Sequence, residues 1–158
     1  MRFSTFVARN FKQIKMAYVK IYLHTVWGTK NRYPFLKNEV RHKVINHILE
    51  NAKKKGIVIV KINGYLDHLH CLIRLNPDMA ISTAVNLIKG ESSYWINKEK
   101  ICEEKFCWAA EYYSESVSEL DLPRVINYIA NQETHHQKIS FKGEYEEMMK
   151  SYIKNQEA

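Results

Sequence analysis

Two histidines one residue apart, His68 and His70, are the pattern in this sequence with the clearest chemical meaning. They lie in the stretch DHLHCLIRL (67–75), where every second residue is apolar: Leu69, Cys71, Ile73 and Leu75. Since side chains alternate faces along a strand, the apolar set predicts a buried face and puts both imidazoles on the opposite, open face. Two imidazoles held in this way by a sheet can share a metal ion. Asp67 precedes the pair and is a candidate to orient one ring from behind.

A tyrosine and a glutamine four residues apart form the second candidate, Tyr128 and Gln132. In a helix this spacing puts both side chains on one face. A phenol beside a metal can attack a phosphodiester, and the amide oxygen can serve as a third ligand. Each pattern also has a plain structural interpretation. His-x-His can be a chance surface pair, and Tyr128 is one of ten tyrosines, any of which can be a core aromatic.

Hydrophobic periodicity predicts the elements that carry these residues. Alternation or β-branched runs predict four strands, and spacing of three and four residues predicts helices between and after them. The strands are expected over 18–27, 57–63, 68–75 and 106–113, and the helices over 37–54, 81–97, about 121–137 and about 143–154. The order βαββαβ is that of the ferredoxin-like (RRM-like) sandwich of the α+β class, with added C-terminal helices, the first of which bears Tyr128.

Length and charge narrow the class of protein. The 158 residues suit one domain, expected over 16–158 after an N-terminal extension at 1–15, and no run is apolar enough for a membrane helix or secretory signal. We therefore expect a cytoplasmic protein. The net charge is +7, and residues 1–60 hold thirteen Lys and Arg against only Glu39 and Glu50. Such an excess suits a polyanion, although a solvated helix face explains part of it.

The three cysteines, Cys71, Cys102 and Cys107, are an odd number without a C-x-x-C pair. This count argues against a disulfide framework and against a structural zinc site. We interpret them as reduced thiols.

Several blocks of the sequence, in order, resemble one family: the HUH single-strand DNA transposases of the one-tyrosine type, including those associated with repetitive extragenic palindromes. The most specific feature is the His-x-His strand followed by Tyr-Ile-x-x-Gln-x-x-His-His at 128–136. The blocks that carry the resemblance are HTVWGTKNRYPFL (24–36), DHLHCLIRL (67–75), LIKGESSYWIN (87–97), FCWAAEYYSESVS (106–118) and VINYIANQETHHQKISFKGEY (125–145).

The resemblance implies a role for each matching residue. His68, His70 and Gln132 would hold Mg²⁺ or Mn²⁺, and Tyr128 would be the nucleophile that leaves a 5′-phosphotyrosine and a free 3′-OH. His135 or His136, one helical turn after Gln132, is an alternative third ligand. Departures from the family pattern lie in 108–113, in the first fifteen residues and in the tail beyond Tyr145.

The resemblance also implies partners, namely single-stranded DNA with hairpin ends and a second copy of the chain in a homodimer. The candidate DNA contacts are Lys30, Arg32, Lys89 and Asn97. Tyr22 and His24, expected on the same strand face as the histidine pair, are candidates to support the site or to stack on a base. Two other functions remain open from the residues alone: a nucleic-acid-binding module without catalysis, and a metal-dependent phosphodiesterase that uses water.

Overall fold

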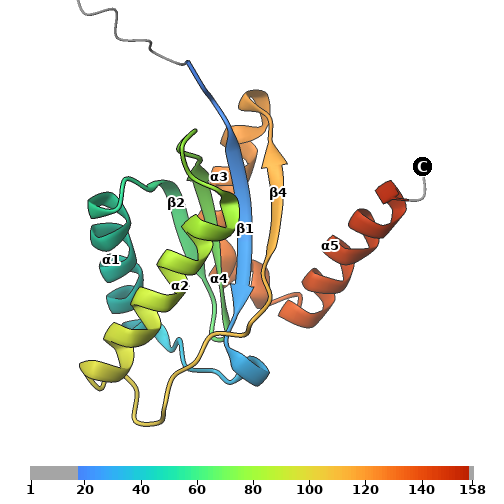
Figure 1. The fold of residues 1–158 in the computed structure, drawn as a ribbon. Helices are drawn as coiled ribbons and strands as arrows, with labels where there is room; N and C mark the ends of the chain where they lie inside the picture. Colours follow the sequence, from blue (N-terminus) through green and yellow to red (C-terminus); the bar gives the residue numbers. More distant parts are fainter. Residues whose placement is uncertain (1–17, 157–158) are drawn as a thin grey trace, which may run out of the picture.

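The computed structural model describes residues 18–156 (Figure 1). The extension expected over residues 1–15 lies outside these, so that boundary stays a prediction. In chain order the elements are β1 (Tyr22–Gly28), η1 (Lys30–Arg32), α1 (Asn38–Lys54), β2 (Val58–Gly64), β3 (His68–Arg74), α2 (Ile81–Lys98), β4 (Tyr113–Val117), η2 (Glu119–Asp121), α3 (Leu122–Ala130), α4 (Gln132–His136) and α5 (Phe141–Gln156).

The four strands form one antiparallel sheet in the order β2-β3-β1-β4. This is the strand order of the predicted ferredoxin-like fold, which the structure confirms. The two central strands, β1 and β3, pair over their full length, with His24 opposite Leu72 and Val26 opposite His70. The two candidate metal ligands His68 and His70 therefore lie on a central strand of the sheet, where the backbone is held from both sides.

Helices α1 and α2 cover one face of the sheet and form the larger core with it. Their apolar stripes, which include Val44, Ile48, Ala84 and Ile88, pack on Leu69, Cys71 and Ile73 of β3. Gly56 ends α1 with a φ of 71°, a conformation that glycine adopts without a steric cost. The expected inward face of the third strand is thus confirmed.

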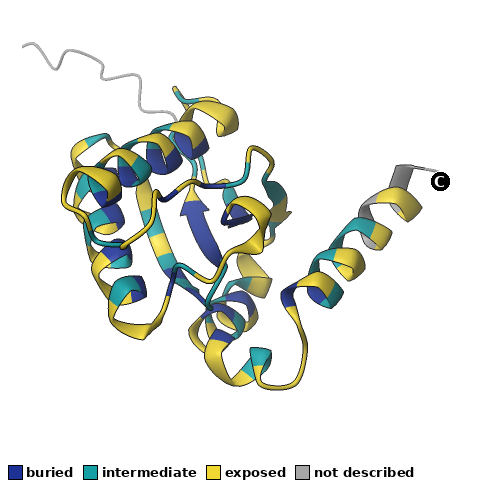
Figure 2. Cartoon of the chain, turned by 90° about the horizontal axis from the view of Figure 1, so that it is seen from below, coloured by how far each residue is buried: buried dark blue, intermediate teal, exposed yellow. Residues whose placement is uncertain are grey.

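The opposite face of the sheet was expected to be open, and that expectation is wrong. Helix α3 packs Val125 and Ile129 onto Leu72 on this face. Figure 2 shows that further helical segments of the chain lie beside the sheet. His68 and His70 are 0% exposed, because the C-terminal helices close over them. The first helix of the tail therefore has a structural role, which is to bury the second face of β3.

Two elements differ from the expectation. The fourth strand lies at Tyr113–Val117 and not at 106–113, where only an isolated bridge joins Trp108 to Thr29. Phe106 and Trp108 do alternate with exposed Cys107, but they do so because both rings enter the α1–α2 core. The pattern of buried and exposed residues is therefore present as expected, but it belongs to an irregular segment and not to a strand.

The helix expected over about 121–137 is broken at Asn131, whose φ of −98° and ψ of 21° separate α3 from α4. The Asn131 side-chain amide donates to the carbonyl of Asn127 at 2.9 Å, a local bond that competes with continuation of the helix. β1 also begins at Tyr22, four residues later than expected, and Tyr18 is 87% exposed. Within residues 18–156 no helix combines the length and apolar character needed to span a bilayer.

Candidate active site

His68 and His70 each use one ring nitrogen within the chain and direct the other toward a common centre. His68 Nδ1 lies 2.8 Å from Asp67 Oδ1, so it donates to that carboxylate and leaves Nε2 with a free lone pair. His70 Nδ1 lies 2.9 Å from His24 Nε2. His24 Nδ1 faces Glu115 at 3.5 Å, which favours the tautomer in which His24 Nε2 accepts from His70. Both Nε2 atoms are then unprotonated and point the same way.

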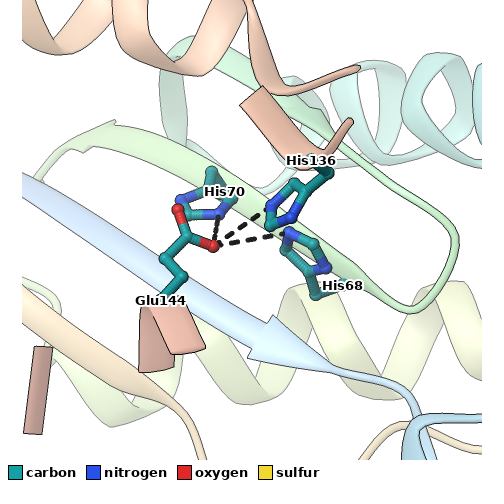
Figure 3. A group of neighbouring side chains, drawn as sticks. All are labelled: His68, His70, His136 and Glu144. Atoms are coloured by element: carbon teal, nitrogen blue, oxygen red, sulfur yellow. Dashed lines mark ion pairs between the residues drawn. The ribbon is translucent and has the colours of Figure 1, made fainter. Parts of the chain in front are cut away.

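Helices α4 and α5 add two more groups to this centre (Figure 3). His136 Nδ1 donates to the carbonyl of Ile139 at 2.7 Å, and its Nε2 lies 3.2 Å from Glu144 Oε2. The same carboxylate oxygen is 3.3 Å from His70 Nε2 and 3.8 Å from His68 Nε2. One ligand atom from each of His68, His70, His136 and Glu144 lies within 4.8 Å of the others. We call these four residues the three-histidine–glutamate cluster.

Four polar atoms at the centre of the cluster lack hydrogen-bond partners within residues 18–156. Nε2 of His68, Nε2 of His70 and both carboxylate oxygens of Glu144 are buried without a hydrogen-bond partner among the described residues. Lone pairs that face one another without a proton or cation between them are costly in a buried site. A divalent cation would satisfy all of these atoms, and imidazole with carboxylate is an ordinary donor set for such an ion. The residues present therefore fit a metal.

The charge state of the isolated cluster agrees with this fit. Burial lowers the pKa of His70 well below its usual value, and it lowers the pKa of His136 to about 4. Burial, assisted by the nearby charge of Asp67, raises the pKa of Glu144 to about 7. Desolvation disfavours every charged form here, so both imidazoles are neutral ligands at neutral pH.

Tyr128 lies at the edge of the cluster on α3. Its ring centroid is 5.6 Å from that of His70, 6.0 Å from that of His24 and 5.2 Å from that of His135, each in an edge-to-face arrangement. The side chain is half-buried and packs against the apolar cluster formed by Leu72, Val125 and Ile129. The fold thus brings the expected nucleophile beside the expected metal ligands, although 58 residues separate it from His70.

Gln132 is the first residue of α4 and is fully buried. Its Oε1 lies 3.0 Å from His136 Nε2, and its Nε2 donates to the carbonyl of Tyr128 at 3.4 Å. Gln132 therefore reaches the cluster through His136 and also links the cluster to the backbone of the tyrosine helix. The structure brings together His68, His70, Asp67, Tyr128 and Gln132, while the role of each stays a prediction.

Glu144 is the member of the cluster that the sequence analysis missed, and His136 appeared there only as an alternative. A signal for Glu144 does exist in the sequence. Phe141, Glu144 and Tyr145 occupy positions i, i+3 and i+4 of a helix, so an acidic residue shares a face with two aromatics. A carboxylate on an apolar face needs a partner, and the preceding His135-His136 pair offers one.

The four candidate DNA contacts fall into two groups. Lys30 and Arg32 are exposed in η1 next to the site, and the Arg32 guanidinium lies 5.4 Å above the ring of Phe141, which itself stacks on His68 at 4.0 Å. Lys89 donates to the carbonyls of Ala110 and Glu111, and Asn97 pairs with both backbone groups of Phe106. Both side chains thus already bind backbone groups within the chain. Their role as DNA contacts stays a prediction.

The chain is similar to known proteins in sequence and in fold. Residues 17–132 match the family model described as "Transposase IS200 like". The ISDra2 transposase TnpA of Deinococcus radiodurans is 28% identical over 115 residues, which cover 69% of this chain and 81% of that protein. The transposase for insertion sequence element IS200 of Salmonella typhimurium is 25% identical over 115 residues, with coverages of 69% and 74%.

Two solved structures share the fold. A proposed transposase from Deinococcus radiodurans R1 superposes with a TM-score of 0.61 and 25% identity, covering 77% of this chain and 97% of that one. A REP-associated tyrosine transposase bound to a REP hairpin superposes with a TM-score of 0.60 and 17% identity, covering 80% and 75%. At that identity the second comparison supports the fold alone.

Proposed function

Because this chain belongs to the family of IS200-like transposases, we propose that it cuts and rejoins single-stranded DNA through a covalent bond to Tyr128. The observation that carries the proposal is the contact between Tyr128 and His70, one of two buried histidines whose free Nε2 atoms fit a divalent cation. A phenol, a metal site on a rigid sheet and a helix packed on that sheet that holds the phenol beside the site are the parts needed for transesterification at phosphorus.

The residues of the site have distinct roles in this proposal. His68 and His70 would hold Mg²⁺ or Mn²⁺ through Nε2, Gln132 would be a third ligand or would position His136, and Asp67 keeps the ring of His68 oriented. An ion bound there would polarise the scissile phosphate and offset the negative charge that builds on its oxygens.

Tyr128 supplies the nucleophile. Its phenol oxygen forms a bond to phosphorus and loses its proton, while the bond from phosphorus to the 3′ oxygen of the preceding nucleotide breaks and that oxygen leaves as a 3′-OH. The product is a 5′-phosphotyrosine, a diester that preserves the energy of the cleaved bond. The 3′-OH of another end can therefore attack it, restore the phenol and rejoin the strand, which is the net reaction of transposition.

Single-stranded DNA with hairpin ends is the proposed substrate, and a homodimer is the proposed assembly. Membership of the transposase family supports a DNA partner, and one transposase that shares the fold is bound to a REP hairpin. In this chain, Arg32 and the rings of Tyr112, Phe141 and Tyr145 line a cavity beside His68, a combination suited to a phosphate and a stacked base.

Trapping the covalent intermediate tests the proposal. The protein is incubated with Mn²⁺ or Mg²⁺ and a single-stranded oligonucleotide that carries the hairpin flanking its gene, labelled at the 3′ end. We expect a protein–DNA band that survives denaturation and is absent with Tyr128→Phe and with His68→Ala. Cleavage that persists in Tyr128→Phe would instead show a phosphodiesterase that uses water. Binding with neither cleavage nor adduct would show a module without catalysis.

A further inference from the structure

The carboxylate of Glu144 has no function in the reaction just described, yet its burial is too costly to be incidental. It is 6% exposed, lies in the first turns of α5 and is aimed at four imidazoles. Neither of its oxygens has a hydrogen-bond partner among the described residues. A carboxylate held in this way is normally neutralised by a cation or by a network of donors.

The spacing around Glu144 Oε2 is that of a coordination sphere. Its distances to Nε2 of His136, His70 and His68 are 3.2, 3.3 and 3.8 Å. Neighbouring ligands of one ion with bonds of about 2.0–2.2 Å are about 3.0–3.4 Å apart, and a six-coordinate ion such as Mn²⁺ would keep two positions open for phosphate or water beside four protein ligands. The Nε2 atoms of the three histidines face the same point, because each Nδ1 is bonded elsewhere. His136 Nε2 also lies 3.0 Å from Gln132 Oε1, and an ion held by this nitrogen would separate the two lone pairs.

We propose that Glu144 and His136 are ligands of the same ion as His68 and His70, so that α4 and α5 complete the metal site of this chain. The inference rests on the proposed metal site and extends it to two residues beyond the part of the chain that matches the family model, which ends at Gln132. Three imidazoles and one carboxylate favour a first-row transition ion such as Mn²⁺ over Mg²⁺, which prefers oxygen ligands.

Metal binding without DNA tests this inference independently of activity. Mn²⁺ is titrated calorimetrically into the wild type, Glu144→Gln, His136→Asn and the control Glu147→Gln, whose carboxylate is exposed on the same helix. We expect Mn²⁺ affinity to fall at least tenfold in Glu144→Gln and His136→Asn and to stay within twofold in the control. Unchanged affinity in Glu144→Gln would overturn the inference.

Two further measurements separate the possible failures. Thermal unfolding with and without Mn²⁺ shows whether Glu144→Gln is folded: without metal it should unfold at or above the wild-type temperature, because a buried unpaired carboxylate has been removed, but gain less from Mn²⁺. A variant that unfolds at a lower temperature without metal, yet gains as much from Mn²⁺, would assign Glu144 a purely structural role. If His68→Ala abolishes Mn²⁺ binding while Glu144→Gln does not, this inference fails and the proposed site stands; if His68→Ala binds normally, the proposed site itself fails.

Discussion

Hydrogen bonds behind the cluster decide which nitrogen each histidine presents to it. Asp67 accepts from His68, His24 accepts from His70, and the carbonyl of Ile139 accepts from His136. An imidazole without such a partner would exchange between tautomers and would rotate, so part of its population would not be available to bind an ion. Three unrelated partners thus produce one common result, a set of Nε2 atoms that face the same centre.

Replacement of Asp67 by alanine should therefore weaken metal binding although Asp67 does not face the centre. Removal of the partner of a ligating histidine typically costs 10- to 100-fold in metal affinity, so we expect the Kd for Mn²⁺ to rise by about that factor. Calorimetric titration measures it directly. The matched control is Asp78→Ala, an exposed carboxylate in the loop after β3, and equal losses in the two variants would argue against an orienting role.

The three thiols should differ sharply in reactivity. Cys71 is fully buried on the core face of β3, and burial raises the pKa of its thiol, whereas Cys107 is exposed. Only a thiolate reacts readily, so Cys71 should resist a thiol reagent such as DTNB at pH 8 until the protein is unfolded. Counting the thiols that react before and after addition of guanidinium checks this. Loss of the late-reacting thiol in Cys71→Ala identifies it, and rapid reaction of Cys71 in the native protein would show that the core face of β3 is open.

At the scale of elements, close approach between the ends of β2 and β3 sets the position of His68. A Cβ at Gly64 would fall on the carbonyl oxygen of His68 and come within 2.9 Å of the Cα of Leu69. Backbone atoms cannot move aside as a flexible side chain can. The turn between the strands therefore requires glycine for space and not for an unusual φ.

Gly64→Ala should destabilise the protein by about 3 kcal/mol, the upper end of the usual cost of overpacking. Gly90→Ala is the matched control, because nothing lies within 4 Å of a Cβ at that position of α2. Alanine in a helix interior is favoured over glycine by about 0.5–1 kcal/mol, so this variant should be slightly more stable than the wild type. Urea unfolding of both variants gives the two free energies, and a Gly64→Ala variant as stable as Gly90→Ala would contradict the packing argument.

The elements that the sequence predicted well are those whose pattern is local. The alternation of Leu69, Cys71 and Ile73 predicted both the strand and the face that carries the histidines, because a period of two follows from strand geometry alone. The contact of Glu144 with His70 joins positions 74 residues apart through the break at Asn131 and the start of α5. No periodicity encodes such a meeting, so the carboxylate was predicted on a helix but not in the site.

For the fourth strand, a local pattern predicted the wrong segment. Phe106 and Trp108 alternate with Cys107 as they would in a strand, but the Lys89 ammonium and the Asn97 amide hold this segment by its backbone groups. These bonds replace the ladder that a strand would make. True pairing begins at Tyr113, in the polar stretch YSESV, where Thr25 and Ser114 lie side chain to side chain at 2.9 Å. Edge strands of this kind carry little apolar signal.

At the scale of the molecule, the layers separate the basic residues into two populations. Helix α1, which ends in Lys53 and Lys54, packs with α2 on one face of the sheet, whereas α3 and the cluster lie on the other (Figure 1). Lys30 and Arg32, at the end of β1, border the cavity and the cluster. The net charge of +7 alone therefore does not show where a DNA strand binds.

The salt dependence of binding distinguishes the two populations. Each phosphate contact to a single strand contributes about 0.7 to the slope of log affinity against log salt concentration. If Lys30 and Arg32 each neutralise one phosphate, Lys30→Gln/Arg32→Gln should lower the slope by about 1.4, while Lys53→Gln/Lys54→Gln, which removes the same charge, should leave it almost unchanged. Fluorescence anisotropy with a hairpin oligonucleotide measures both slopes, in a Tyr128→Phe background that prevents covalent capture.

Two outcomes would contradict this prediction. An equal decrease of the slope in both double variants would mean that the strand follows the summed charge of the molecule. A decrease only in the α1 variant would place the DNA on the face opposite the cluster, where Tyr128 cannot reach it.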